Sequence, residues 1–486
     1  MTSTAKDSLS EKQKNQTTQA TEAVAFSLSQ IDLFIDDNKI TYVRKKSNNV
    51  VWNLNSRQFK DWLISVFYEN KKVILRRNVI DEVISTLSGI ARDKGDVRKV
   101  FVRVAVLGKR YFLDLCQEGN SKTIEISEGI CRIIDSPPVM FIRPDSMLAL
   151  PDPEFLDIND INLLWGICNI PIDCHVLVIS YLIESFRPDT PYPILEIIGE
   201  QGSAKSTTQA VLRELIDPNS CNLRIIQKSV DDLFVSASVN HIISYENVSF
   251  LSPKIQDGLC TIATGGGHAK RMLYRDADEI VLYAKRPVML NGISAVVTAS
   301  DLIDRTITIE LQPINNRKEV QTLWDEFNCN KKRILGALLM LFSQSLLKLP
   351  KVELPSMHRP RLVEFAYLGC AVSEVMGNHH TKFLDAFTNT RKEAVQRILD
   401  GDVIAHAVID WFEKNNRQTT ELPLGALFDA VKRSEPTITN LTRTAKGFGT
   451  IVRRLAPLLR QYGLNVKSLG KRGSHVLWHV SPYDIN

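Results

Sequence analysis

The segment GEQGSAKST, residues 199–207, joins an apolar run to a helical pattern. The apolar run ILEIIG (194–199) has the length of a buried strand, and KSTTQAVLRELI (205–216) has the apolar spacing of a helix. A glycine-containing turn in this context gathers backbone N–H groups into a concave set of donors for phosphate oxygens. The segment therefore predicts a phosphate-binding loop, with Ala204 standing where the usual pattern has its second glycine.

Lys205 and Ser206 have specific expected roles in this loop. Lys205 would reach the β- and γ-phosphates and the Ser206 hydroxyl would coordinate Mg²⁺, so ATP with Mg²⁺ is the expected cofactor. The methyl group of Ala204 is tolerable if this residue has a negative φ, because only a left-handed conformation penalises a Cβ strongly. The other residues expected to bind the nucleotide are Gly199, Glu200, Gln201, Gly202, Ser203, Ala204 and Thr207.

An enzyme with such a loop also needs an acid at the end of a neighbouring strand, to handle the metal and the attacking water. The segment HIISYEN, residues 241–247, supplies Glu246 followed by Asn247. Many such enzymes have a second acid here, so either Glu246 acts through the metal while Asn247 orients water, or another acid contributes. A solvated glutamate at a strand end is the alternative interpretation.

Two further polar residues follow in the order that a multi-subunit ATPase needs. RPVMLNG (286–292) carries Asn291 at the end of an apolar strand, where its amide can contact the γ-phosphate or the attacking water. DLIDRTITIEL (301–311) places Arg305 where it could reach the nucleotide of an adjacent subunit. An arginine supplied in this way stabilises the charge that develops during phosphoryl transfer. For each residue alone, a surface or capping role remains open.

Taken together, these segments resemble an AAA+ ATPase, and specifically the helicase-type ATP-binding proteins of phages, plasmids and integrated mobile elements. The Ala-Lys-Ser ending of the loop is similar to that of minichromosome-maintenance helicases, and the whole resembles a replicative helicase of that type or of superfamily three. The resemblance rests on about 120 residues in strict order: GEQGSAKST, ISYENVS, IATGGGHAKRMLYRDADEIVLYAKRPVMLNGI and DLIDRTITIEL.

The resemblance implies an ATP-dependent, ring-forming DNA helicase or replication initiator that assembles as a homo-oligomer, with a hexamer expected. It also implies a helical lid after the core, with an arginine that contacts the nucleotide. HRPRLVEFA (358–366) offers Arg359 and Arg361 for that role. We prefer Arg361 because it opens the helical pattern, and a local surface contact is the alternative.

The expected fold class is α/β, with an AAA+ core and lid flanked by two further domains. Alternation of strands and helices over the core predicts a parallel sheet covered on both faces. The N-terminal tail is too polar to order itself, so we expect it to be flexible. The expected parts are a tail (1–29), an N-terminal α+β domain (30–150), the AAA+ core (151–315), the helical lid (316–400) and a C-terminal winged helix (401–486).

A predicted β-hairpin directly before the Asn291 strand is the first candidate contact with DNA. Its strand-like halves are KRMLYR and EIVLYAK, on either side of DAD. Resemblance to hexameric helicases implies that it points into a central pore and touches single-stranded DNA, whereas packing between subunits is the alternative. The candidate contacts are His268, Lys270, Arg271 and Arg275.

The C-terminal segment is the second candidate contact. From Leu441 to Val480 it has eight Lys and Arg residues and no Asp or Glu. Three helices followed by a basic two-stranded wing describe a winged helix-turn-helix, which would engage duplex DNA. A basic face on a protein-docking domain is the alternative. The candidate contacts are Lys446, Arg453, Arg454, Lys471 and Arg472.

Composition disfavours several other classes of protein. The eight cysteines form no C-x-x-C pair, so we expect reduced thiols and neither disulfides nor a zinc site. The longest apolar stretches, such as ILGALLMLF (334–342), are shorter than the roughly 20 residues of a membrane-spanning helix. We therefore expect a cytoplasmic, nucleoid-associated protein with no membrane partner.

A second hypothesis is a DNA-binding switch, in which the nucleotide controls assembly and little of it is hydrolysed. Asn247 in place of a second acid is its main support. A small-molecule kinase fits less well, because Arg305 and the basic C-terminal segment would have no role in it.

Overall fold

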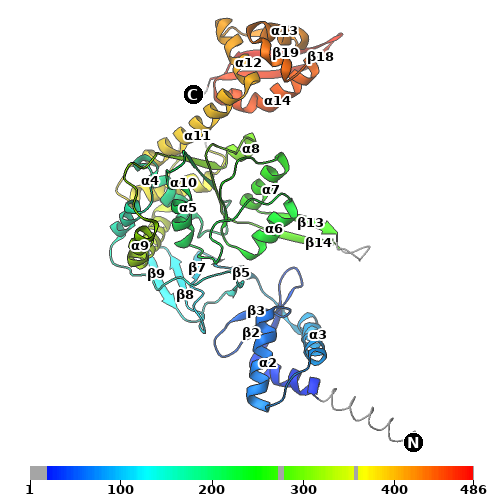
Figure 1. The fold of residues 1–486 in the computed structure, drawn as a ribbon, viewed down its shortest axis with the longest axis vertical. Helices are drawn as coiled ribbons and strands as arrows, with labels where there is room; N and C mark the ends of the chain where they lie inside the picture. The colour runs from blue at the N-terminus through cyan, green and yellow to red at the C-terminus, as the bar shows by residue number, and fades with distance from the viewer. Residues whose placement is uncertain (1–18, 272–278, 355–359, 485–486) are drawn as a thin grey trace, which may run out of the picture.

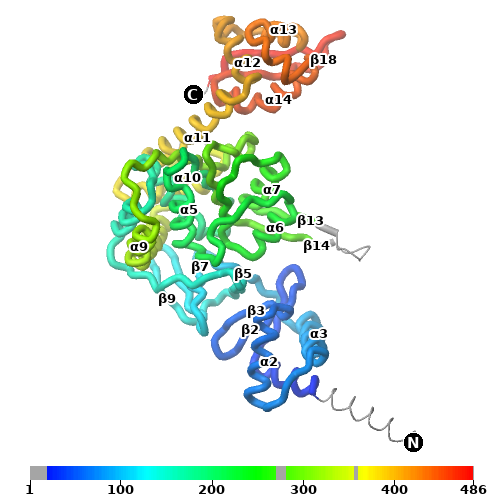
Figure 2. The backbone as a smooth tube through the Cα atoms, viewed as in Figure 1, coloured from blue at the N-terminus to red at the C-terminus, as the bar shows by residue number. Residues whose placement is uncertain are grey.

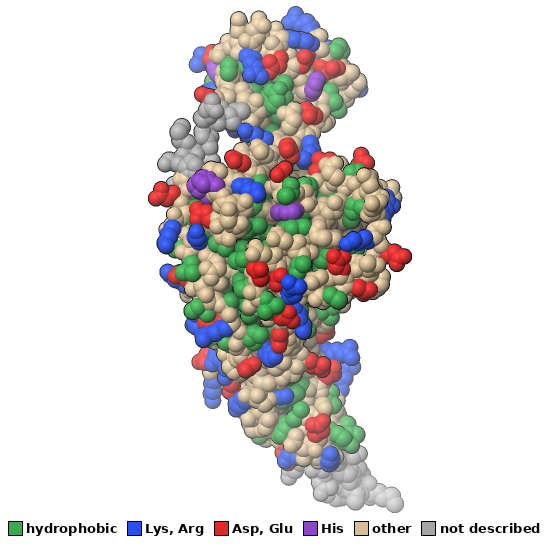
Figure 3. Space-filling view, turned by 90° about the vertical axis from the view of Figure 1, so that its left-hand side faces the viewer, with side chains coloured by type: hydrophobic (Ala, Val, Ile, Leu, Met, Phe, Trp, Pro, Cys, Tyr) green, Lys and Arg blue, Asp and Glu red, His purple; other side chains and the backbone are tan. Residues whose placement is uncertain are grey.

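The computed structural model describes residues 19–271, 279–354 and 360–484. Along the longest axis, Figure 1 shows an N-terminal part, a large central part and a C-terminal part, and the tube in Figure 2 follows the chain from one to the next. On the face drawn in Figure 3, acidic and basic side chains are interspersed along the length of the molecule, in keeping with a net charge of only +5.

Part of the segment expected to be a flexible tail is helical. Residues 19–30 form a helix in which Ala23 and Ser27, one turn apart, are buried. Phe26 meets the ring of Phe67 edge to face, 5.8 Å between centroids. A polar helix needs an apolar residue only once per turn to pack on a neighbour, which is why composition alone gave the wrong expectation for this stretch.

The N-terminal part is a six-stranded sheet with two helices, α2 (Arg57–Lys71) and α3 (Arg77–Lys94). The sheet has the order β4-β1-β2-β3-β10-β5. Its strands are β1 (Ile31–Ile35), β2 (Thr41–Lys45), β3 (Val51–Asn53), β4 (Asp96–Val97), β5 (Val100–Val102) and β10 (Met140–Ile142).

A second, four-stranded sheet divides the single domain that we expected over residues 30–150. It is the meander β6 (Val104–Leu107), β7 (Arg110–Asp114), β8 (Thr123–Ser127) and β9 (Ile130–Ile134). Its apolar face packs on the long helix α9 (Val320–Lys348), with the rings of Tyr111 and Phe342 5.1 Å apart. The meander therefore belongs to the hydrophobic core of the central part.

The central part is built on four parallel strands in the order β12-β15-β11-β16, which confirms the predicted parallel sheet. The strands are β11 (Ile194–Gly199), β12 (Ile243–Tyr245), β15 (Val288–Gly292) and β16 (Thr306–Leu311). Successive residues of β11 point to opposite faces, so Leu195 and Ile197 belong to one hydrophobic cluster and Ile194 to the other.

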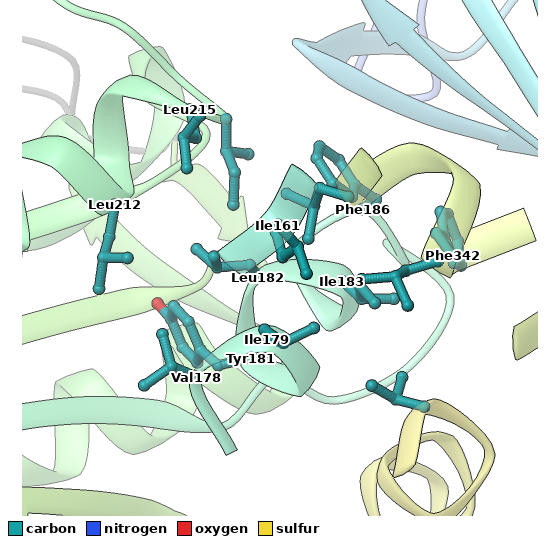
Figure 4. Packing of buried hydrophobic residues seen from close by; sticks show 14 of the residues in the cluster. Ile161, Val178, Ile179, Tyr181, Leu182, Ile183, Phe186, Leu212, Leu215 and Phe342 are labelled. Atoms are coloured by element: carbon teal, nitrogen blue, oxygen red, sulfur yellow. The ribbon is translucent and has the colours of Figure 1, made fainter. Parts of the chain in front are cut away.

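Helices cover both faces of this sheet. The cluster on one face includes side chains of α4 (His175–Glu184) and α5 (Lys205–Glu214), and the cluster on the other includes side chains of α6 (Val230–Val239) and α7 (Pro253–Thr264). Figure 4 shows how side chains of α4, α5 and α9 and of the short helix η1 (Ile158–Gly166) point toward one another. Two further short helices, η2 (Ile172–Cys174) and α8 (Ser300–Ile303), precede α4 and β16.

The predicted hairpin is present as β13 (Gly266–Arg271) paired with β14 (Glu279–Ala284). It stands out from the central part beside α6 (Figure 1). After β16 the chain is helical, as expected for residues 316–400, and forms α9, η3 (Leu349–Lys351), α10 (Val363–Val375) and α11 (Thr381–Gly401).

The C-terminal part contains the three helices and terminal hairpin predicted from the sequence. They are α12 (Val403–Lys414), α13 (Leu424–Ser434), α14 (Ala445–Gln461), β18 (Leu464–Arg472) and β19 (His475–Pro482). A short strand, β17 (Thr420–Pro423), completes a sheet of order β17-β19-β18, and η4 (Pro436–Asn440) precedes α14. The apolar face of α14 packs on the fully buried Trp478.

Among the described residues, one helical stretch, Val320–Lys351, is long and apolar enough by composition to cross a membrane. Most of its apolar window is buried inside the protein, where Ile334, Leu338 and Phe342 lie in the same cluster as α4 and the meander. Packing within the central part accounts for these apolar side chains.

A buried ion pair joins the meander to the central sheet. Arg103 Nε donates to Asp217 Oδ1 at 3.0 Å, and neither side chain is more than 1% exposed. The other Asp217 oxygen accepts from the backbone N–H groups of His241 and Ile242, just before β12. The Asp217 pKa is lowered although burial alone would raise it, because Arg103 and Arg213 favour the carboxylate.

We expect Arg103→Ala to lower the free energy of unfolding by about 3–5 kcal/mol, because it leaves the buried Asp217 carboxylate with only Arg213, 4.0 Å away, as a cationic partner. The matched control is Arg57→Ala, which breaks the exposed pair with Asp61 and should change stability by less than about 1 kcal/mol. Urea denaturation of the full chain measures both. Equal changes in the free energy of unfolding would show that the buried pair contributes no more to stability than the exposed pair.

Candidate functional site

The predicted phosphate-binding loop lies between the end of β11 and the start of α5. Asn169 fixes it from outside, because its Nδ2 donates to Ser203 O at 3.2 Å and to Gln312 O at 2.7 Å. The backbone N–H groups of Gln201 and Gly202, and those of the first three residues of α5, donate to no partner in the described part of the chain. These donors are available to an anion.

Ala204 has a left-handed conformation, with φ 61° and ψ 29°. The negative φ that would make the methyl group tolerable is therefore absent at this residue. Ala204 is the residue just before α5, where the chain must turn sharply from the loop into the helix, and glycine would adopt this conformation without cost. The methyl group at this position costs about 1–2 kcal/mol of backbone strain.

Lys205 is held inside the loop by two backbone carbonyl groups. Its Nζ donates to Gly199 O at 2.8 Å and to Glu200 O at 2.7 Å. Burial lowers the pKa of this ammonium group. Ser206 and Thr207 follow in the first turn of α5, and both are partly exposed.

Glu246 directly follows β12, at the same edge of the sheet as the loop. Its backbone N–H donates to Arg224 O at 2.9 Å, which fixes the peptide, while its carboxylate makes no hydrogen bond or ion pair with any residue that the structure describes. Asn247 has φ 52°, a left-handed conformation that asparagine tolerates. A free carboxylate and a serine hydroxyl on adjacent elements fit the oxygen ligands that Mg²⁺ prefers.

Asn291 connects the ends of three elements. Its Oδ1 accepts from Asn247 N at 2.9 Å, and its Nδ2 donates to Gln209 Oε1 at 2.6 Å. Gln209 Nε2 in turn donates to Ser244 Oγ at 2.8 Å and to Tyr245 O at 3.0 Å. Asn291 therefore positions the peptide that follows Glu246 relative to α5.

Gln209 is a residue that the sequence analysis missed. It is fully buried, although its side chain is polar. A sequence signal existed, since Gln209 lies on the same helical stripe as Leu212 and Ile216, where an apolar residue would be expected. A polar side chain in such a stripe indicates a buried hydrogen-bond network.

Arg305 lies at the opposite edge of the sheet from its own phosphate-binding loop. It directly precedes β16, whose first residue pairs with Ile194, whereas Leu311 at the other end pairs with Gly199 of the loop. The length of β16 separates them, about 20 Å at roughly 3.3 Å per residue. Arg305 Nη1 donates to Asp301 O at 3.0 Å and lies 3.5 Å from the Asp301 carboxylate.

Arg361 lies at the same edge as Arg305. It forms an ion pair with Asp301 and lies 3.9 Å from Asp304. Arg361 is therefore remote from the loop of its own chain, because the segment before α10 runs to α8 at the far edge of the sheet, and its contact with a nucleotide stays a prediction. Arg359, the other candidate, is outside the described residues.

Arg317 is a second residue that the sequence analysis missed. Gly202 of the loop has φ 88°, and a Cβ added there would meet the guanidinium group, 3.1 Å from Arg317 Cζ. Because parallel strands end at the same edge of a sheet, the segment after β16 returns to the loop, and this rule could have identified a basic residue there.

His268 of the hairpin is engaged within the chain. Its Nε2 lies 2.6 Å from Asp231 Oδ1 of α6, and its ring centroid is 5.3 Å from that of Phe234. These contacts anchor the base of the hairpin to α6. Lys270 and Arg271 lie in β13, but their side chains are outside the described part of the structure, as is the whole of Arg275.

The C-terminal candidates share one property: they are exposed and form no ion pair with any described residue. They are Lys446, Arg453 and Arg454 on α14, and Lys471 and Arg472 on the β18–β19 hairpin. Arg453 also lies over the ring of Trp478, 5.4 Å from its centroid, so part of its side chain packs on the core.

The C-terminal part contacts the edge that carries Arg305. Gln461, at the end of α14, donates to Asp304 Oδ1 at 3.2 Å, and the same oxygen lies 2.6 Å from Nη2 of Arg391 on α11. Asp304 directly precedes Arg305 in the sequence, so this contact links the last helix of the chain to the edge of the sheet that carries Arg305.

Comparison with known proteins gives one family match. Residues 161–392 match the model of the actinomycete integrative conjugative element replication protein family. The matched stretch contains the phosphate-binding loop, Glu246, Asn291, both edges of the sheet and the helices up to α11. This stretch is thus similar to replication proteins of a mobile element.

Two solved structures are similar to the chain over most of its length. "The A form apo structure of NrS-1 C terminal region-CTR" has a TM-score of 0.41 at 12% identity, covering 95% of this chain and 98% of that chain. "SCCmec type IV Cch - active helicase" has a TM-score of 0.49 at 13% identity, covering 93% of each chain. No curated protein matches the sequence.

We expect Ala204→Gly to raise the free energy of unfolding by about 0.5–1 kcal/mol, because relief of the left-handed strain outweighs the added freedom of the unfolded chain. The control is Ala210→Gly in the interior of α5, which should lower it by about 1 kcal/mol. Urea denaturation measures both. A loss of stability in both variants would contradict the strain at Ala204.

Proposed function

We propose that this protein is an ATP-dependent DNA helicase or replication initiator of a mobile genetic element, working as a ring of identical subunits. In this proposal the central part is an AAA+ core with a helical lid, and the ring is a hexamer. One observation carries it: the phosphate-binding loop and Arg305 lie at opposite edges of one sheet. A single copy cannot bring them together, whereas neighbouring copies in a ring can.

The loop supplies the half of the site that holds the nucleotide. Backbone N–H groups of residues 201–207 would bind phosphate oxygens, Lys205 would leave the carbonyls of Gly199 and Glu200 for the β- and γ-phosphates, and Ser206 and Glu246 would hold Mg²⁺. When bound at these two oxygen ligands, the metal ion would supply positive charge beside the phosphates. Asn247 would orient the attacking water, because Asn291 fixes its peptide beside Glu246.

The surface around the loop supports a neighbouring subunit there. Three large apolar side chains are strongly exposed near this edge: Ile225 at 83%, Phe250 at 72% and Ile293 at 73%. Phe250 and Ile293 follow β12 and β15, and Ile225 follows the bridge between Arg224 and Tyr245. Such side chains are the kind that an adjoining copy covers.

The opposite edge offers the complementary half. Arg305, Arg361 and Arg391 converge on Asp301 and Asp304, which hold the three guanidinium groups beside α8, that of Arg305 mostly buried. In the proposed ring this edge faces the loop of the next copy, and Arg305 stabilises the charge that develops on the transferred phosphate.

Two regions would contact DNA. The β13–β14 hairpin would line the pore and touch single-stranded DNA with Lys270, Arg271 and Arg275. The C-terminal part would act as a winged helix on duplex DNA, with α14 in the major groove and the β18–β19 hairpin along the phosphates. Five exposed cations that form no ion pair with a described residue suit this role, since pairing them with phosphates releases counterions.

One observation favours a second function, a nucleotide-controlled DNA-binding switch with little hydrolysis. Asn247, the residue beside Glu246, has no carboxylate, and its backbone N–H is committed to Asn291. With no second acid directly after Glu246, nucleotide binding alone would drive assembly.

ATP turnover with and without single-stranded DNA tests these alternatives. We expect DNA to stimulate the wild-type rate and Lys205→Ala to abolish it. Arg305→Ala should lower the rate by about 10³-fold or more while the nucleotide affinity changes little, because Arg305 is remote from its own loop. Arg57→Ala, on the N-terminal part, serves as the control with an unchanged rate.

Each contrary result has a distinct meaning. Full turnover by Arg305→Ala would exclude catalysis at a seam between subunits. Wild-type turnover no faster than that of Lys205→Ala, with DNA binding intact, would instead favour the switch.

A further inference from the structure

We propose that Arg317 binds the phosphates of the nucleotide held by the loop of its own chain. This inference rests on the proposed function, because it assumes that the loop binds ATP, and it adds a cationic ligand that the motif does not contain. Arg317 lies in the segment between β16 and α9, outside every motif identified in the sequence.

The course of the chain brings this segment to the loop. β16 and β11 are parallel neighbours, so the last residue of β16, Leu311, pairs with Gly199 at the start of the loop. Asn169 then joins the two segments, since its Nδ2 donates to Gln312 O and to Ser203 O. The attachment at Gln312 holds the segment beside the loop five residues before Arg317.

Gly202 makes room for the guanidinium group. Gly202 has φ 88°, a conformation that favours glycine. A Cβ built at this residue would collide with Arg317 Nη2 and lie 3.1 Å from Cζ, so only glycine leaves space for the guanidinium group. The guanidinium group is therefore in contact with Gly202, one of the loop residues whose N–H donates to no described partner.

The charge of Arg317 is available, unlike that of its neighbour. Arg317 is exposed and makes no hydrogen bond or ion pair with any described residue. Lys318 donates to Glu326 Oε2 at 2.9 Å and approaches Gly166 O at 3.4 Å. An unpaired guanidinium group beside a set of unpaired N–H donors fits an anion with several oxygens, and its planar fork matches phosphate.

This position differs from that proposed for Arg305. Arg305 would act on the nucleotide of another copy from the far edge of the sheet, whereas Arg317 already touches the loop of its own chain. The two arginines would approach the phosphates from different subunits, so loss of Arg317 weakens binding even in an unassembled copy.

Titration of the full chain with a fluorescent ATP analogue and Mg²⁺ tests the proposal. We expect Arg317→Ala to weaken binding by about 10- to 100-fold, the effect of losing a charge-assisted contact, and Arg317→Lys to weaken it less. Lys318→Ala is the matched control and should stay within about twofold, because its charge is already paired. In displacement of the analogue, the inhibition constant of tripolyphosphate should be higher for Arg317→Ala than for the wild type. The inhibition constant of adenosine should be the same for both proteins.

The outcomes separate this inference from the proposed function. If the wild type binds the analogue, Lys205→Ala does not, and Arg317→Ala binds like the wild type, then Arg317 is no ligand and the proposed function stands. Equal weakening by Arg317→Ala and Lys318→Ala would reduce the effect to general charge and overturn the inference. A wild type that does not bind the analogue would overturn both.

Discussion

The parallel pairing of β11 with β16 is the constraint on which the candidate site depends. Because the two strands run side by side in the same direction, the loop after β11 and the arginine before β16 must lie at opposite edges of the sheet. The same pairing returns the chain after β16 to the loop, which brings Arg317 against Gly202. The register of β11 with β16 thus keeps Arg305 away from the loop of its own chain and brings Arg317 close to that loop.

Buried polar contacts hold the elements around this sheet in place. Gln209 and Asn291 join α5 to the ends of β12 and β15, so the loop and the segment carrying Glu246 keep a fixed relation. Asp217 and Arg103 join the meander to the central sheet, and Asp304 joins Gln461 of the C-terminal part to the edge near Arg305. Low-dielectric surroundings make such satisfied networks rigid, and the contact at Asp304 connects α14 to α8.

Local patterns in the sequence were sufficient for the strand, loop and helix around Lys205, the parallel sheet, the hairpin and the C-terminal helices. They failed where packing decides. The residue type at position 204 does not determine its φ. The left-handed conformation of Ala204 follows from the turn of the chain into α5. The position of Arg361 depends on how the segment before α10 crosses the core, and the contacts of Gln209 and Arg317 join segments distant in sequence. Likewise, the helix over residues 19–30 packs through only a few apolar contacts.

A mixing experiment tests most directly whether the site is assembled from two copies. The Lys205→Ala variant keeps Arg305 but has a defective loop, and the Arg305→Ala variant keeps the loop but lacks the arginine. Each variant alone should therefore be inactive. When equal amounts are mixed at random, about a quarter of the subunit interfaces should combine an intact loop with an intact Arg305. The mixture should therefore recover about a quarter of the wild-type ATP turnover. A mixture that is no more active than either variant alone would contradict the account.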